Sequence, residues 1–107
     1  MTLPRWTAAQ MEENVAAGGV ILVELRADWC PQCGSQEEVL SRLQPDLEEV
    51  VTFATVDVTD DQALPARFGV QGLPAFLLYA GGDLKDVTVG FHRAPQVRAA
   101  LRPVIEA

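Results

Sequence analysis

The sequence predicts one α/β domain in which a mixed β-sheet is flanked by helices on both faces. The chain has 107 residues, a length typical of a single compact domain, so we assign residues 1–107 to one unit. Apolar segments alternate with amphipathic ones along the chain, as in sheets whose strands are connected by helices. A glycine turn separates the last two apolar segments and predicts a hairpin.

The N-terminal part predicts a helix followed by a buried strand. The helix is expected to begin at Thr7, because Thr7 and Gln10 have the spacing of a capping box. Gly18-Gly19 is expected to end it. Residues 20–25 form an apolar run interrupted only by Glu24, which predicts a buried strand.

The middle of the chain predicts two further helices around a second strand. Apolar residues recur at helical spacing over residues 39–50, in a helix that Pro45 is expected to kink or split. Residues 51–58 are β-branched and aromatic, as in a buried strand. A short helix capped by Asp60 or Asp61 then extends through Phe68 and ends at Gly69.

The C-terminal part predicts a hairpin and a final helix. Residues 75–79 and 87–89 predict two strands, joined by a turn at residues 81–83. Pro95 suits the first turn of a last helix, which should extend to about residue 105.

Composition and charge narrow the possible partners. The formal net charge is −7, which disfavours binding to nucleic acid. The apolar runs are too short to cross a bilayer, so we expect no membrane partner. Residues 1–19 include Glu12 and Glu13 and have no apolar core like that of a signal peptide. We therefore expect a cytoplasmic protein.

Cys30 and Cys33 are the only cysteines, and their spacing favours redox chemistry. A disulfide across three positions closes almost no loop, so it would stabilise the fold little. A structural zinc site needs four ligands, and the chain offers two cysteines and one histidine. We therefore predict no metal site. An inert pair, or one that only contacts a metal, is the alternative interpretation.

The position of the pair between a strand and a helix indicates how it would react. A residue that precedes proline avoids helical angles, so Cys30 suits the N-cap and Pro31 the first helical position. The N–H groups of Gln32 and Cys33 should then point toward the Cys30 sulfur. These donors and the helix dipole favour the thiolate. Cys30 is thus the predicted attacking thiol and Cys33 the resolving one.

Two segments resemble the thioredoxin family. Residues 23–33 are similar to its active-site segment, and residues 68–75 to its proline-loop segment. Gly82 and Gly90 fall where the family has glycines. The resemblance covers about residues 14–105. It implies a thioredoxin fold, with a central mixed sheet flanked by helices on both faces.

The resemblance also implies a substrate site. The peptide bond before Pro74 should be cis, which would leave the backbone of Leu73 open to pair with a substrate peptide. The residues implied in docking surround the cysteine pair. They are Trp29, Pro31, Gly72, Leu73, Pro74, Gly90 and Phe91.

Glu24 occupies the place of a buried aspartate in thioredoxins. The resemblance implies that it exchanges a proton with Cys33, and burial would raise the pKa of its carboxyl into a useful range. The alternative interpretation is a charge at the strand end that reaches solvent.

Several residues depart from the family pattern. Pro31 stands first between the cysteines, as in glutaredoxins and periplasmic oxidases, and Arg26 replaces a usual tryptophan. Pro31 and Arg26 predict a potential less reducing than that of a typical thioredoxin. We expect Arg26 to be solvated and His92 to lie on the surface. The other departures are Gly34, Glu38 and Thr55.

The predicted function is reduction of protein disulfides through a redox-active Cys30–Cys33 disulfide. A thioredoxin reductase would restore the dithiol, and no bound cofactor is needed. We expect a monomer. The alternatives are a disulfide oxidase or isomerase, which the Pro31 position permits, and a thioredoxin-fold adaptor or holdase without turnover.

Overall fold

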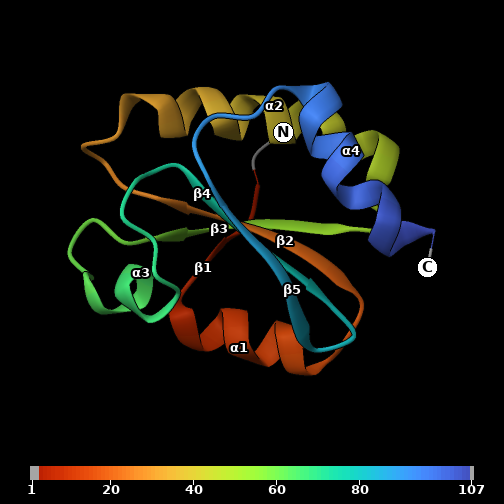
Figure 1. Ribbon diagram of the computed structural model, residues 1–107, viewed down its shortest axis with the longest axis horizontal. Coiled ribbons are helices and arrows are strands. Elements are labelled where there is room, and N and C mark those ends of the chain that lie inside the picture. Colours follow the sequence, from red (N-terminus) through yellow and green to blue (C-terminus); the bar gives the residue numbers. More distant parts are fainter. Residues whose placement is uncertain (1–2, 107) are drawn as a thin grey trace.

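The computed structural model describes residues 3–106, so Met1, Thr2 and Ala107 of the predicted domain lie outside the described residues. Strands and helices alternate along most of the chain, and Figure 1 shows their arrangement. The elements in chain order are β1 (Arg5–Trp6), α1 (Ala8–Ala16), β2 (Val20–Arg26), α2 (Pro31–Leu47), β3 (Thr52–Asp57), α3 (Ala63–Arg67), β4 (Ala75–Ala80), β5 (Asp83–Val89) and α4 (Ala94–Ile105).

The five strands form one mixed sheet in the order β1-β3-β2-β4-β5. The central strand β2 pairs in parallel with β3 and antiparallel with β4. At the two edges, β1 runs parallel to β3 and β5 antiparallel to β4. The predicted mixed sheet is confirmed, and its middle strand is the one that leads to the cysteine pair.

Helices cover both faces of this sheet, as predicted. Figure 1 shows α2 and α4 on one face and α1 and α3 on the other. Alternate residues of β2 enter two separate cores, because successive side chains of a strand point to opposite faces. Val23 packs with Met11 of α1 and Leu64 of α3, whereas Leu22 packs with Leu40 of α2 and Leu101 of α4. Glu24 therefore points to the α2 face.

Most of the predicted helix caps and turns are found at the residues where the sequence predicts them. Thr7 and Gln10 form the predicted capping box, in which the Gln10 N–H donates to Thr7 Oγ1 at 3.1 Å and the Thr7 N–H to Gln10 Oε1 at 2.9 Å. Asp61 accepts from the N–H groups of Ala63 and Leu64 at the start of α3. The hairpin turns at Gly81 and Gly82, which have φ angles of 60° and 88°.

Three expectations about the elements are wrong. β1 was not predicted, because two residues are too few to show a pattern. β5 begins at Asp83 instead of residue 87. Residues 83–86 at the start of this edge strand are exposed and, apart from Leu84, polar, so the sequence showed no apolar run there. Of the two effects expected of Pro45, the split is wrong, because α2 continues to Leu47. Pro45 has no N–H to donate to the helix, but only two helical residues follow it, so little of α2 depends on this position.

None of the helices within residues 3–106 is both long enough and apolar enough to cross a membrane.

Candidate active site

Cys30 and Cys33 lie at the beginning of α2, directly after the strand β2. Cys30 is the N-cap, with extended backbone angles (φ −107°, ψ 101°), and Pro31 opens the helix, as predicted. The two sulfurs are joined in a disulfide, with 5.5 Å between the Cα atoms. Cys33 is fully buried, whereas Cys30 is partly exposed. A partner in solution can therefore reach the first sulfur but not the second.

One detail of the predicted helix start is different. The Cys30 side chain accepts no capping hydrogen bond, and the Cys33 N–H donates instead to the Cys30 carbonyl oxygen at 3.2 Å. The structure is that of the oxidised form, in which the Cys30 sulfur is bonded to its partner sulfur and carries no charge for these donors to stabilise.

Glu24 is fully buried, so the interpretation as a charge that reaches solvent is wrong. Its neighbours across the strands are Thr55 on β3 and Phe76 on β4. Neither carboxyl oxygen has a hydrogen-bond partner among the described residues. Burial, together with the nearby negative charge of Glu37, raises the pKa of Glu24 to about 9, although Arg26 acts to lower it. A carboxyl in this state holds a proton at neutral pH.

The prediction that Arg26 is solvated is wrong, because its side chain is only 12% exposed. Its Nη1 donates to Asp28 at 2.8 Å and to Asp57 on β3 at 2.7 Å, while Nε donates to Glu37 on α2 at 3.1 Å. These bonds raise the pKa of the guanidinium, so Arg26 stays charged throughout the physiological range. Its donors are directed to carboxylates, and it makes no hydrogen bond to Cys30 or Cys33.

The proline loop lies between α3 and β4. The Leu73–Pro74 peptide bond is cis, as the resemblance implied. Pro74 is buried, while Gly72 and Leu73 before it are partly exposed. The Gly90 N–H at the end of β5 donates to the Pro74 carbonyl oxygen at 2.8 Å. The structure thus brings the two predicted docking segments, at residues 72–74 and 90–91, into direct contact.

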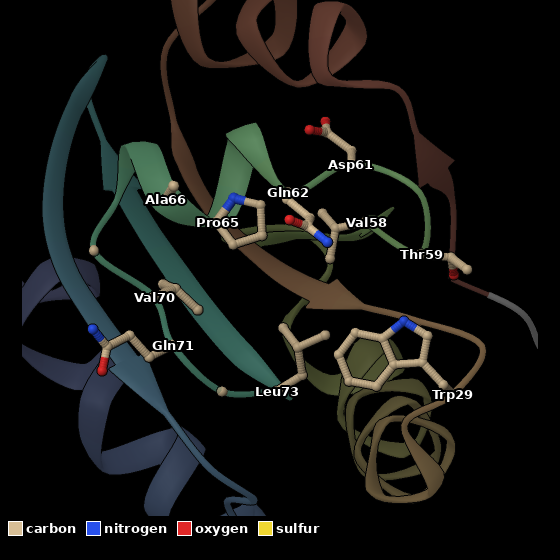
Figure 2. Close-up of a pocket in the computed structure, with 12 residues that line it drawn as sticks. Trp29, Val58, Thr59, Asp61, Gln62, Pro65, Ala66, Val70, Gln71 and Leu73 are labelled. Carbon is tan, nitrogen blue, oxygen red and sulfur yellow. The ribbon is translucent and has the colours of Figure 1, made fainter.

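A groove of about 560 Å³ opens between Trp29, the proline loop and α3 (Figure 2). Trp29 is 65% exposed and forms one wall, and Leu73 lies beside it. Val58, Pro65 and Val70 supply apolar surface from the side of α3. Of the predicted docking residues, Trp29, Gly72 and Leu73 line this groove. The other four, Pro31, Pro74, Gly90 and Phe91, do not, although Pro31 and Phe91 are also exposed.

One polar residue of this region was not singled out from the sequence. Gln36 of α2 is fully buried and hydrogen-bonded to the backbone of His92. His92 itself was expected on the surface, but it is partly buried and its ring packs in a T-shaped arrangement with the ring of Phe76. The spacing of Cys33, Gln36 and Leu40 by three and four places Gln36 on the buried side of the helix, and this signal was available.

Known proteins resemble the chain over most of its length. The family model described as thioredoxin matches residues 3–103. A thioredoxin of Pseudomonas aeruginosa is 29% identical over 96 residues, which cover 89% of each chain. A thioredoxin of Staphylococcus haemolyticus is 30% identical over 92 residues, covering 86% of this chain and 88% of the relative.

The fold is also similar to a solved structure. A mutant thioredoxin from Halobacterium salinarum superposes with a TM-score of 0.84 over 97% of this chain and 93% of that one, at 24% sequence identity. This likeness confirms the thioredoxin fold. Together with the family match over residues 3–103 and the disulfide-bonded Cys30–Cys33 pair, it shows that the chain belongs to the thioredoxin family, whose general activity is thiol–disulfide exchange.

Proposed function

We propose that this protein reduces disulfide bonds in other proteins, with Cys30 as the attacking thiol and Cys33 as the resolving thiol. The observation that carries the proposal is the unequal exposure of the two bonded sulfurs at the start of α2. Cys30 is open to solvent at the N-cap, and Cys33 is fully buried one turn further along the helix. This arrangement suits one sulfur for contact with a substrate and the other for an internal step.

The reaction transfers two electrons from the dithiol to the substrate. The Cys30 thiolate attacks one sulfur of the substrate disulfide, forms a mixed disulfide and releases the other substrate sulfur as a thiolate. Cys33 then loses its proton and attacks the Cys30 sulfur, which releases the second substrate thiolate and closes the Cys30–Cys33 bond. The cysteine pair carries both electrons, so the proposed cycle needs no bound cofactor.

Glu24 is proposed to take the proton that Cys33 loses. The carboxyl lies on the sheet face that α2 covers, and Cys33 is buried on α2 itself. In the oxidised structure the raised pKa of Glu24 keeps the carboxyl protonated, as expected if it has just received that proton. When the disulfide is reduced again, Glu24 would return the proton to the Cys33 sulfur.

Substrate docking is proposed on the surface formed by Trp29, Pro31, the proline loop, Gly90 and Phe91. An extended substrate segment would pair with the partly exposed backbone of Leu73, as in other cases of strand addition. The groove beside Trp29 would receive an apolar side chain of that segment, because its lining includes Val58, Pro65 and Val70.

A thioredoxin reductase in the cytoplasm is the proposed electron donor, and the protein is proposed to act as a monomer. The family supports protein disulfides as substrates and a reductase as partner. The acidic net charge of −7 is consistent with protein partners in preference to nucleic acid.

The test is a mixed-disulfide trap with the Cys33→Ser variant. Without the resolving thiol, Cys30 should remain covalently bound to its substrate, and mass spectrometry of trapped species should place the bond at Cys30. The matched control is Cys30→Ser, which should trap nothing. Steady-state reduction of insulin by the wild type should disappear in both variants.

Other outcomes would favour the alternatives. Faster oxidation of reduced proteins than reduction of insulin would indicate an oxidase or isomerase. Full function of a Cys30→Ser, Cys33→Ser double variant would indicate an adaptor or holdase, because such a protein needs neither thiol.

A further inference from the structure

Gln36 connects the helix of the cysteine pair to the segment that follows β5. Its Nε2 donates to the His92 carbonyl oxygen at 2.9 Å, and its Oε1 accepts from the His92 N–H at 2.7 Å. The side chain is fully buried. One amide thus satisfies both backbone groups of His92, as a neighbouring strand would.

The segment of residues 90–92 is fixed at both ends around Phe91. On one side the Gly90 N–H donates to the Pro74 carbonyl oxygen at 2.8 Å. On the other side His92 is held by Gln36, and its ring Nδ1 lies 2.8 Å from the Gly90 carbonyl oxygen. Phe91 between these anchors is 37% exposed. In Figure 1 this segment crosses from β5 to α4 next to α2.

Gln36 also has a fixed position relative to the cysteines. It lies three residues after Cys33 in the same helix, and both side chains are fully buried. The helix therefore sets where the Gln36 amide lies, and the amide in turn sets where residues 90–92 lie. Removing it would leave the partly buried N–H and carbonyl of His92 unpaired, and the segment would have to move to find new partners.

We infer that Gln36 is a positioning residue that holds Phe91 in the proposed docking surface and thereby favours protein disulfides over small ones. The inference rests on the proposed function. A protein substrate contacts the surface around the sulfurs, whereas a small disulfide needs only access to Cys30. Loosening the segment at residues 90–92 should therefore weaken docking of proteins more than the exchange chemistry.

The test compares two substrates with the variant Gln36→Met, which keeps the length of the side chain but removes both hydrogen bonds. Rates are measured with insulin, a protein disulfide, and with dithiobis(nitrobenzoate), a small disulfide. We expect kcat/KM for insulin to fall about tenfold, chiefly through KM, and at least about fivefold more than kcat/KM for the small disulfide.

The matched control is Gln44→Met, the same substitution on the same helix. The Gln44 Oε1 has no hydrogen-bond partner among the described residues, so little should change. A second readout is amide hydrogen exchange, which should become faster at His92, whose N–H donates to Gln36, in Gln36→Met only. Equal losses on both substrates, or exchange unchanged at His92, would overturn the inference.

A double variant distinguishes positioning from a general loss of stability. If Gln36 acts through Phe91, adding Phe91→Ala to Gln36→Met should cost little beyond either single change, whereas independent effects would add. If Gln36→Met does not fold, Gln36→Glu replaces it, since a carboxyl keeps an acceptor for the His92 N–H and loses the amide donor. The same selective loss on insulin is expected, and an equal loss on both substrates contradicts the inference.

The proposed function fails in a different way. A wild-type protein that reduces neither insulin nor dithiobis(nitrobenzoate) would refute the proposed activity. A wild type that reduces both, with a Gln36→Met variant that shows no selectivity, would refute only the role of Gln36.

Discussion

Arg26 on β2 and Asp57 on β3 are paired across the parallel strands and joined by a 2.7 Å hydrogen bond from Nη1 to Oδ2. Glu37 on α2 binds the same guanidinium through Nε. The cation that acts to lower the pKa of Glu24 is therefore already bonded to other carboxylates. Burial and the negative charge of Glu37 prevail, and Glu24 remains a neutral acid at pH 7.

The first prediction concerns stability and pH. The pKa of Glu24 is about 9 in the oxidised folded protein, against an ordinary value of 4.5, so between these pH values the folded state holds a proton that the unfolded chain releases. The stabilising contribution is complete below pH 4.5 and is lost as pH rises through 9. Between these values it should decrease on the order of 1 kcal/mol per pH unit.

The Glu24→Gln variant measures this contribution, because its amide does not titrate. Urea unfolding of the oxidised proteins from pH 5 to pH 9 should show the variant gaining stability relative to the wild type as pH rises. A difference between the two proteins that stays constant over this range would show that Glu24 is ionised in the folded protein.

The second prediction concerns the carboxylate next to this acid. Glu37→Gln removes a negative charge that raises the pKa of Glu24. It also leaves the charge of Arg26 less compensated, and both effects lower the pKa of Glu24. NMR titration of the glutamate carboxyl carbons should therefore show a lower midpoint for Glu24. In the control Glu38→Gln, which removes an exposed neighbouring charge, the midpoint should stay where it is.

The third prediction compares two arginines. Arg26→Met removes a side chain that is 12% exposed and bonded to Asp28, Glu37 and Asp57, so the free energy of unfolding should fall by roughly 1 to 3 kcal/mol. Arg42→Met breaks a pair with Glu38 whose side chains are 80% and 67% exposed, and should cost less than about 0.5 kcal/mol. Chemical denaturation measures both, and equal losses would contradict the structural role of Arg26.

The fourth prediction concerns the reduced protein. Iodoacetamide at pH 7 should label Cys30 an order of magnitude faster than Cys33, because Cys33 is fully buried and Cys30 lies partly exposed at the helix N-terminus. Peptide mass spectrometry at short times gives the two rates. Preferential labelling of Cys33 would reverse the assigned roles.

The features that the sequence predicts well are local ones. The N-cap position of Cys30 follows from a strand, a proline and a helix within a few residues. Burial of Glu24 follows from one acid in an apolar run. The mixed sheet follows from the order of apolar and amphipathic segments, and the Leu73–Pro74 cis bond was implied by family resemblance alone.

The features that the sequence did not predict depend on contacts between distant residues. Whether Arg26 is solvated or buried depends on Asp57, 31 positions away, lying opposite it in the sheet. The register between β2 and β3 sets this pairing, and the sequence does not give the register. The pairing of Gln36 with His92 spans 56 positions. The two-residue strand β1 forms because it pairs with the edge of β3, and this tertiary contact cannot be predicted from the two residues of β1 alone.

One turn of α2 already brings the Cα atoms of Cys30 and Cys33 to 5.5 Å, within the range of about 4.4–6.8 Å that disulfides need. Making or breaking the bond then requires rotation of two side chains and no shift of the backbone. A substrate protein would therefore bind nearly the same surface before and after electron transfer. Its dissociation must depend on the altered charge and bonding of the two sulfur atoms, because the shape of the docking surface hardly changes.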